Sequence, residues 1–585
     1  MADKETTSFM RSLCMGIIEE DVLLPFPVMA EKEGETLRQI FDSFRQFLGS
    51  REKEFRAWDV AGELPVGILE EIRQFGLFGL VLPEEAGGLG LGNTAYSRTL
   101  QELSRYDGSV AATVGAHSSI GLRGLLLFGT EEQRARFYPK LATGEMIAAF
   151  CLTEPGAGSD AAGIKTTAVR DGDDWVLNGS KLWITNGGLA SFFTVFARTG
   201  KPDERGKLTA FIVTKDMAGV SVGPHEDKMG LRASSTTAVF LDGVRVPAAN
   251  VLGEVGKGFK VAMRILNSGR SGLGGGCVGG MKRMIELATR QAKGRVQFGK
   301  PIAEFGLIKQ KVGHMVVETY AAESAVAMVA GLVDQGYEDY AVEAAISKVF
   351  ATEALWRTTD EALQIAGGNG YMREYPYERA LRDCRIFRIW EGTNDILRLF
   401  IALTAMNDVG ERLAGLAASL KGVLNDPIKG FGVLSEYALH RASLATNVGR
   451  EHGAFTRLSP VLKREGDAFA AHTRDLASAA DRILRKHGKR IVDMQFATRR
   501  LADIMIDLFM MACVLSRVDA SVRRLGEKGA ARELEILRVF AGQVQRRVKS
   551  NYGKIDDNDD ELIKSLADHA FAEERFSWDN LPSQR

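Results

Sequence analysis

The stretch from Gln364 to Phe400, QIAGGNGYMREYPYERALRDCRIFRIWEGTNDILRLF, indicates how the second half of the chain is arranged. A helical pattern from Ala341 to Ile365 ends in the glycine-rich run 367–370, which is typical of a helix stop. Another helix is predicted from Asp395 to Leu403, after a capping residue. Glu391 is therefore expected at a bend between two helices.

Glu391 stands between Trp390 and Gly392. A carboxylate beside an aromatic ring loses hydration, its pKa rises, and such a group suits a general base. A loop glutamate in contact with water is the plainer interpretation, and this feature alone leaves both open.

The same stretch resembles the catalytic segment of the acyl-CoA dehydrogenases, most closely that of their very-long-chain branch. In that family a Q-I-x-G-G-N-G run lies at the flavin, and the Glu of an E-G-T run abstracts the substrate α-proton. The resemblance implies FAD as the cofactor, Glu391 as the catalytic base and Gly392 as a substrate contact. It also implies flavin contacts for Gln364, Gly367, Gly368, Thr393 and Asp395.

The whole chain has 585 residues, of which 45% are hydrophobic and 26% charged, with a net charge of zero. These values predict a globular protein of several domains and give no support to nucleic-acid binding. Five cysteines without C-x-x-C spacing and scattered histidines predict neither disulfides nor a metal site. The first residues carry acids and no long apolar run, so we expect no targeting peptide and a cytoplasmic protein, or one peripheral to the inner membrane.

Changes of hydrophobic period divide the chain into five segments. Residues 1–34 form an extension, 35–150 are helical, 151–260 are rich in strands, 261–410 are helical again, and 411–585 form an additional helical segment. The expected fold class is α+β: the acyl-CoA dehydrogenase fold, with a helical, a β and a helical-bundle domain, plus an extra C-terminal helical domain.

Glycine-rich dipeptides punctuate the strand-rich segment. Asn178-Gly179 and Asp242-Gly243 are each flanked by short apolar runs, which predicts two hairpin turns.

In the second helical segment, residues 274–279 fit the spacing of a dinucleotide-binding loop, but the preceding pattern is helical. We therefore expect a helix break there.

The run CLTEPGAGSD, residues 151–160, is on spacing alone a polar turn after a strand. It closely resembles the family signature that lies beside the isoalloxazine ring, and a W-I-T-N run covers the flavin in the same family. For Trp183 a buried core position is the alternative. The resemblance assigns to the flavin Leu152, Thr153, Gly158, Ser159, Trp183, Ile184 and Thr185, with Ser159 also a candidate for substrate binding.

The run beginning at Gly294 falls short of a P-loop because Pro301 replaces the Ser or Thr that would bind Mg²⁺. Read as R-x-Q-F-G, it resembles the family segment that crosses a dimer interface to the partner's FAD. Arg295 would then pair with the pyrophosphate, since a guanidinium binds phosphate well, and Gln297 and Phe298 would contact the adenosine side. The resemblance thus implies a homodimer.

The run around Gly269 matches the family's substrate-side helix, which implies substrate contacts for Asn267 and Arg270. Some members carry their catalytic Glu at the position of Gly269, and glycine cannot abstract a proton, which leaves Glu391. Gly121 and Gly124 would share one helix face and leave room for a long acyl chain. Close helix packing is the alternative role for these two glycines.

The implied reaction is dehydrogenation of a long-chain acyl-CoA to the trans-2-enoyl-CoA in fatty acid β-oxidation, with electrons passing to an electron-transferring flavoprotein. An acyl-CoA oxidase that uses oxygen, or a scaffold protein on the same fold, are the alternatives. In residues 411–429, apolar positions at helical spacing with basic neighbours predict a peripheral membrane contact. The alternative is that this face packs against the protein's own core.

Overall fold

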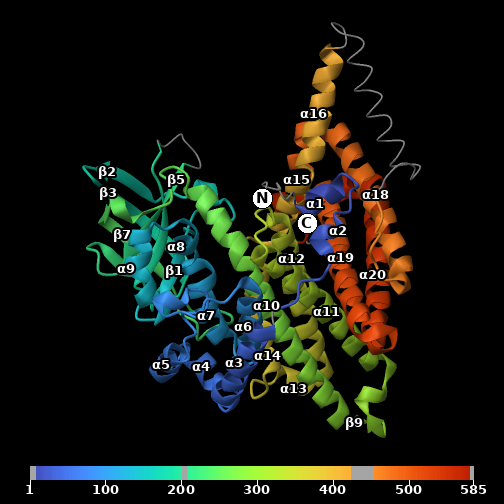
Figure 1. Ribbon diagram of the computed structural model, residues 1–585, viewed down its shortest axis with the longest axis horizontal. Coiled ribbons are helices and arrows are strands. Elements are labelled where there is room, and N and C mark those ends of the chain that lie inside the picture. The colour runs from blue at the N-terminus through green and yellow to red at the C-terminus, as the bar shows by residue number, and fades with distance from the viewer. Residues whose placement is uncertain (1–7, 30, 201–206, 423–452, 580–585) are drawn as a thin grey trace.

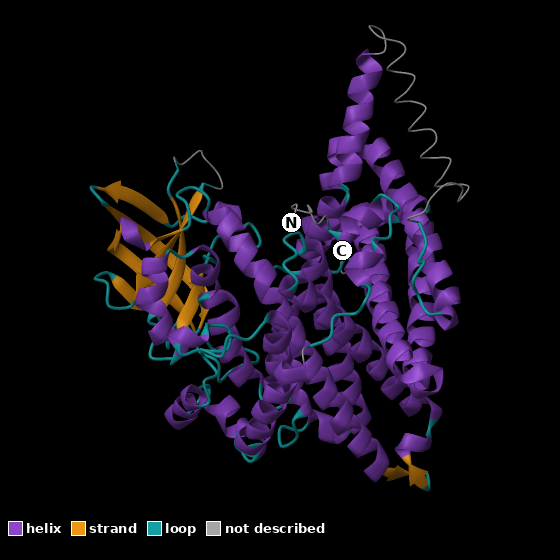
Figure 2. Ribbon diagram, in the orientation of Figure 1, coloured by secondary structure: helices purple, strands orange, loops and turns teal. Residues whose placement is uncertain are grey.

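The computed structural model describes residues 8–29, 31–200, 207–422 and 453–579 (Figure 1). The strands gather on one side of a largely helical molecule, as Figure 2 shows. A mixed sheet between two helical parts, followed by further helices, confirms the α+β fold class.

The first helical part surrounds an apolar core of its own. Along α3 the residues Leu37, Phe44 and Leu48 recur at helical spacing and are buried, as an amphipathic helix requires. A π-helical turn, His117–Gly121, joins α7 to α8. The helices of this part are α3 (Glu31–Gly49), α4 (Phe55–Ala61), α5 (Val66–Gln74), α6 (Asn93–Ser104), α7 (Gly108–Ala116), α8 (Arg123–Phe128) and α9 (Glu131–Ala142).

The sheet has the order β6-β7-β3-β2-β4-β5-β8, with β1 paired to β4 in parallel. The central strands β4 and β5 are buried on both faces, since helices cover one side and the other strands pack on the second. The strands are β1 (Ala148–Cys151), β2 (Thr167–Asp171), β3 (Asp174–Thr185), β4 (Phe192–Arg198), β5 (Leu208–Thr214), β6 (Val220–Val222), β7 (Thr236–Pro247) and β8 (Val251–Leu252).

The two predicted hairpin turns are wrong, because β3 and β7 each run straight through them. The antiparallel register of these strands pairs Leu177 with Val244 and then Gly179 with Leu241, so both dipeptides lie opposite each other as an irregularity in the ladder. The Gly243 N–H donates to Asn178 Oδ1 over 2.8 Å. Turn-forming residues here build one bulge, in which Asp242 and Gly243 of β7 lie opposite Asn178 of β3, and a bulge twists long strands without ending them.

The second helical part begins with α10 (Gly258–Gly294), a single helix of 37 residues. The expected break at residues 274–279 is therefore wrong. A Cβ at Gly275 would lie 2.4 Å from the Ser97 carbonyl oxygen, and one at Gly279 would lie 2.0 Å from that of Gln101. These glycines let α6 and α10 approach closely, and that packing outweighs their weak helix propensity.

A short hairpin, β9 (Val296–Gln297) and β10 (Lys300–Pro301), follows α10. The remaining elements of this part are α11 (Gly306–Asp334), α12 (Ala341–Ala366), α13 (Gly368–Tyr371), α14 (Tyr377–Cys384), a 3-10 turn at Arg385–Arg388, and α15 (Asn394–Ala405). Two stretches, 108–128 and α11, are long and apolar enough to cross a membrane, yet 67% of each window is buried inside the fold.

The last helices lie beside α11, α12 and α15, on the side of the molecule away from the sheet (Figure 1). They are α16 (Asn407–Gly422), α18 (Lys463–His487), α19 (Gln495–Gly529), α20 (Ala531–Asp556) and α21 (Asp560–Glu573).

The N-terminal extension packs against these last helices through α1 (Phe9–Cys14) and α2 (Glu20–Leu23). The rings of Phe9 and Phe509 are 6.2 Å apart, and Ser8 Oγ donates to Glu343 Oε1 on α12 over 2.6 Å. Residues 8–24 are thus part of the core that the last helices form.

Candidate active site

One cavity of about 360 Å³ lies where the sheet, α7, α10 and the bend before α15 meet. Its wall brings together residues that are more than 200 positions apart in the sequence. Of the residues predicted from the sequence, it contains Leu152, Thr153, Gly158, Ser159, Trp183, Ile184, Thr185, Asn267, Arg270, Glu391 and Gly392.

The bend that carries Glu391 has an unusual backbone. Glu391 has φ of 54° and Gly392 has φ of 91°, so a non-glycine residue is held in the left-handed region. The buried Lys348 of α12 donates through Nζ to the Gly392 carbonyl oxygen and to Asn394 Oδ1, both over 2.9 Å. Lys348 therefore ties the bend to α12 and fixes the direction of the Glu391 side chain.

The Glu391 carboxyl has the electrostatics of a base. Its Oε2 atom is buried and has no hydrogen-bond partner among the described residues. Burial raises the pKa of Glu391, while the charges of Lys348 and Arg270 oppose that rise. Burial lowers the pKa of Lys348 to about 8 and that of Arg270 to about 10. An acceptor with a raised pKa and a free oxygen beside a cavity can take a proton from a bound molecule.

The opposite wall is part of α10. A Cβ at Gly269 would lie 3.6 Å from Glu391 Oε2, so this position does face the same point in the cavity. Glycine supplies no acid there, which agrees with Glu391 as the base. Arg270 Nη1 donates to Asn267 Oδ1 over 2.5 Å, and these two polar side chains lie beside Gly392.

The sheet side of the cavity fits a flat cofactor. Trp183 has φ of 58° and is 63% exposed, so it is not a core residue. The turn after β1 is held by a buried ion pair in which Lys181 Nζ donates to Glu154 Oε1 over 2.7 Å. The Thr153 N–H donates to no group of the described protein and lines the cavity. An open aromatic side chain and a free donor beside it suit the isoalloxazine ring of FAD.

Lys348, Glu154 and Lys181 were missed in the sequence. Lys348 is a lone cation in an apolar helical run, AAISKVFA, and a charge on a buried helix face is a usable signal. Glu154 and Lys181 lie 27 residues apart on different segments, and no local pattern indicates that they meet.

Other predicted residues lie outside this cavity. Arg295, Gln297 and Phe298 belong to the exposed hairpin at the far end of α10 from the sheet (Figure 1), and Phe298 is 95% exposed. Their predicted role is to contact the FAD of a second subunit, which lies outside this chain. Thr393 caps α15, because its Oγ1 accepts from the Ile396 N–H over 3.3 Å. Four more are exposed: Gln364, Gly367, Gly368 and Asp395.

The predicted pocket role of Gly121 and Gly124 is wrong, because neither lines the cavity. A Cβ at Gly121 would lie 2.8 Å from the Ala148 carbonyl oxygen, and one at Gly124 would lie 2.7 Å from Leu252 Cδ2. Both glycines serve the alternative, close packing of the π-turn and α8 on the sheet.

This fold and this site define the class of flavin-dependent acyl-CoA dehydrogenases. Family models agree along most of the chain: those of the acyl-CoA dehydrogenase N-terminal, middle and C-terminal domains match residues 34–145, 149–244 and 256–406. The model of the ACAD9/ACADV C-terminal domain matches residues 460–576.

Comparison with individual proteins also finds acyl-CoA dehydrogenases. The mitochondrial very long-chain specific acyl-CoA dehydrogenase of Homo sapiens is 45% identical over 534 residues, which cover 89% of this chain and 80% of that protein. That of Bos taurus is 42% identical over 575 residues, with 97% and 87% covered. The crystal structure of a Bacillus anthracis acyl-CoA dehydrogenase complexed with FAD has a TM-score of 0.79 at 33% identity, covering 95% and 94%. The chain belongs to the acyl-CoA dehydrogenase family, and its cofactor is FAD.

Proposed function

We propose that this enzyme oxidises long and very long acyl-CoA thioesters and passes the electrons to an electron-transferring flavoprotein. The main support is the shape of the cavity, which continues beyond Glu391 between α6, α7 and α10. Small residues line this part: Gly108, Ala111, Ala112, Gly115, Ala116, Gly272 and Gly276. They leave an apolar passage that an alkyl chain fills favourably.

In the reaction, the Glu391 carboxylate accepts the proton from the carbon next to the thioester carbonyl. The charges of Lys348 and Arg270 lower the pKa of this carboxyl and so favour its ionised form, against the effect of burial. Asn267, Arg270 and Ser159 bind the substrate, and the apolar walls exclude water from the reacting carbons. FAD, when bound beside Trp183, supplies the hydride acceptor for the β-hydrogen.

The test is anaerobic reduction of the flavin by acyl-CoA thioesters from four to 22 carbons. We expect bleaching that is fastest with the long chains, followed by reoxidation by an electron-transferring flavoprotein and little peroxide on exposure to air. Rapid peroxide formation would make the enzyme an oxidase. Fastest bleaching with the four-carbon substrate would contradict the long-chain assignment.

We also propose a homodimer in which Arg295, Gln297 and Phe298 reach the FAD of a second copy. Their exposure at the end of α10 supports this. Sedimentation of the wild type and of an Arg295→Ala variant, with FAD content measured, tests it. We expect a dimer and a loss of FAD in the variant, whereas a monomer with full FAD would contradict it.

The predicted membrane contact of residues 411–429 remains a proposal. Most of these side chains lie outside the described residues. Co-sedimentation with anionic liposomes tests the contact, and a protein that stays in the supernatant would refute it.

A further inference from the structure

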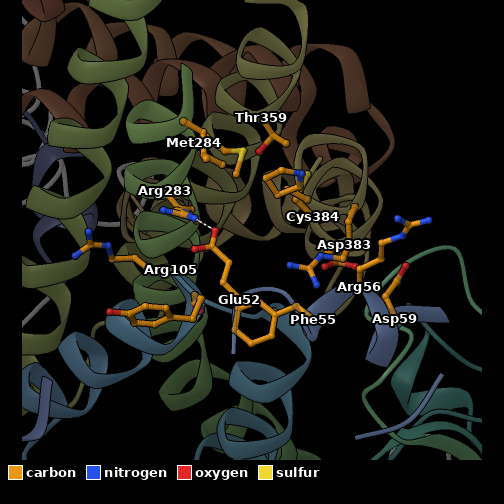
Figure 3. Close-up of a pocket in the computed structure, with 18 of the residues that line it drawn as sticks. Glu52, Phe55, Arg56, Asp59, Arg105, Arg283, Met284, Thr359, Asp383 and Cys384 are labelled. Carbon is orange, nitrogen blue, oxygen red and sulfur yellow. Dashed lines mark hydrogen bonds and ion pairs between the residues drawn. The ribbon is translucent and has the colours of Figure 1, made fainter. Parts of the chain in front are cut away.

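A second, larger chamber of about 620 Å³ lies farther along α10 from the acyl cavity, between α10 and α14. Figure 3 shows its wall, with Phe55, Met284 and Cys384 among the apolar residues and Arg56, Arg105 and Arg283 among the charged ones. Neither the dehydrogenation nor the flavin contacts described above use it.

The chamber and the acyl cavity share part of their walls. Ser104, Gly108, Gly276 and Phe387 line both, so the two spaces meet at these four residues, which are called the constriction below. Three of the four have small side chains or none. Only the ring of Phe387 is large, and it packs on Trp390 at 5.0 Å.

The helix α10 connects the two spaces along one face. Gly269 faces Glu391, Gly272 and Gly276 line the acyl cavity, and Gly276 and Gly280 line the chamber. Seven residues separate Gly269 from Gly276, so the constriction lies about 10 Å along the helix axis from the base. A long acyl chain that continues in this direction reaches the constriction before its end.

The chamber differs from the acyl cavity in its charges. Several of the charged side chains in its wall form ion pairs with each other or with neighbouring residues, such as Arg283 with Glu52 and Arg105 with Glu286. Lys53, Arg56 and Arg373 are exposed and form no ion pair within the described part of the chain, whereas Glu374 is the corresponding unpaired, exposed acid. The opening of the chamber therefore favours a negatively charged group.

We propose that the chamber receives the far end of the longest acyl chains and that it admits chains ending in a carboxylate. The floor of Phe55, Met284 and Leu287 takes the last methylene groups, and the cations at the opening hold the terminal carboxylate in water. The inference rests on the proposed function, because it extends the substrate class of the same site.

Covalent capture tests whether a chain reaches the chamber. The variant Arg56→Cys is incubated with ω-bromodocosanoyl-CoA, whose terminal carbon is attacked by the thiolate as bromide leaves, and the adduct is measured by mass spectrometry. The native Cys384 is a weak competitor, since burial raises its pKa to about 12. We expect labelling at least tenfold faster than with ω-bromohexanoyl-CoA, and no such difference for Lys309→Cys, an exposed position outside the chamber.

Equal labelling by both chain lengths would overturn the inference, provided that the variant still reduces its flavin with docosanoyl-CoA. If no acyl-CoA reduces the flavin of the wild type, the proposed function itself has failed. The two failures are therefore distinguishable.

A kinetic test addresses the constriction and the charges separately. Ser104→Leu narrows the constriction, and we expect its kcat/KM ratio of docosanoyl-CoA to octanoyl-CoA to fall at least tenfold. The triple variant Lys53→Gln, Arg56→Gln, Arg373→Gln should lower kcat/KM for an ω-carboxydocosanoyl-CoA at least fivefold relative to docosanoyl-CoA. An unchanged ratio in Ser104→Leu would exclude passage of the acyl chain through the constriction. An unchanged ratio in the triple variant would exclude binding of the terminal carboxylate by these three cations.

Discussion

Glu391 and Asp383 are two buried carboxyls on the same short segment, one on each side of the constriction. Burial raises the pKa of both, and that of Asp383 rises to about 7. They differ in their partners. Arg379 and the Leu231 N–H, which Asp383 Oδ1 accepts over 2.6 Å, lower the pKa of Asp383, while Asp107 and Asp59 raise it. Glu391 has Lys348 and Arg270 as its charged neighbours and keeps an oxygen without a hydrogen-bond partner among the described residues.

A raised pKa alone therefore does not mark a base. What distinguishes Glu391 is an unpartnered oxygen, in a cavity, opposite a residue without a side chain. Asp383 instead joins α14 to the loop before β7, which is a structural role.

The largest expected effect is that of Glu391→Gln. Loss of a general base slows proton transfer by about 10²–10⁴-fold, so flavin reduction by acyl-CoA should fall by that range while FAD stays bound. Stopped-flow absorbance of the flavin band measures this. Asp383→Asn is the matched control; if it lost as much activity, the distinction between the two carboxyls would be wrong.

The next effect is that of Lys348→Met on the pH profile. The positive charge of Lys348 lowers the pKa of Glu391, so its removal raises that pKa and keeps the base protonated to higher pH. The acid limb of kcat/KM should therefore move to higher pH, and the activity of the variant relative to wild type should fall most at the acid end of the profile. Lys348→Arg keeps the charge and should leave the limb near its wild-type position. If the acid limb of the pH profile shifted in both variants, the cause would be a changed geometry of the bend around Glu391 and not the charge of Lys348.

The smallest effect concerns stability. Because Asp383 binds its proton more tightly when folded, the protein loses stability as pH rises from about 4 to the folded pKa of about 7. Asp383→Asn removes this ionisation and keeps an oxygen for the Leu231 N–H. The fall in melting temperature between pH 5 and pH 7.5 should therefore be smaller in the variant. An unchanged fall would show that Asp383 titrates as it does in the unfolded chain.

The sequence predicted those features that local patterns determine. The position of Glu391 between two helices and the gathering of Leu152, Trp183 and Arg270 around it follow from runs that the family shares. The bulge formed by Asn178 opposite Asp242 and Gly243 could not be predicted, because a turn dipeptide acts differently when another strand lies opposite. The predicted helix break at residues 274–279 and the predicted pocket role of Gly121 and Gly124 were wrong for a similar reason. A glycine can make room for a ligand or for a neighbouring backbone, and only the tertiary contacts show which of the two it does.

The contact of Phe9 with Phe509 has a consequence for synthesis of the chain. A ribosome adds about 5–20 residues per second, so about 25–100 seconds separate the two rings. During that interval the apolar face of α1, with Phe9, Met10 and Leu13, has no partner in the last helices. Residues of α1 are thus made long before the partners against which they pack, which leaves an interval in which a chaperone that shields short apolar segments can bind them.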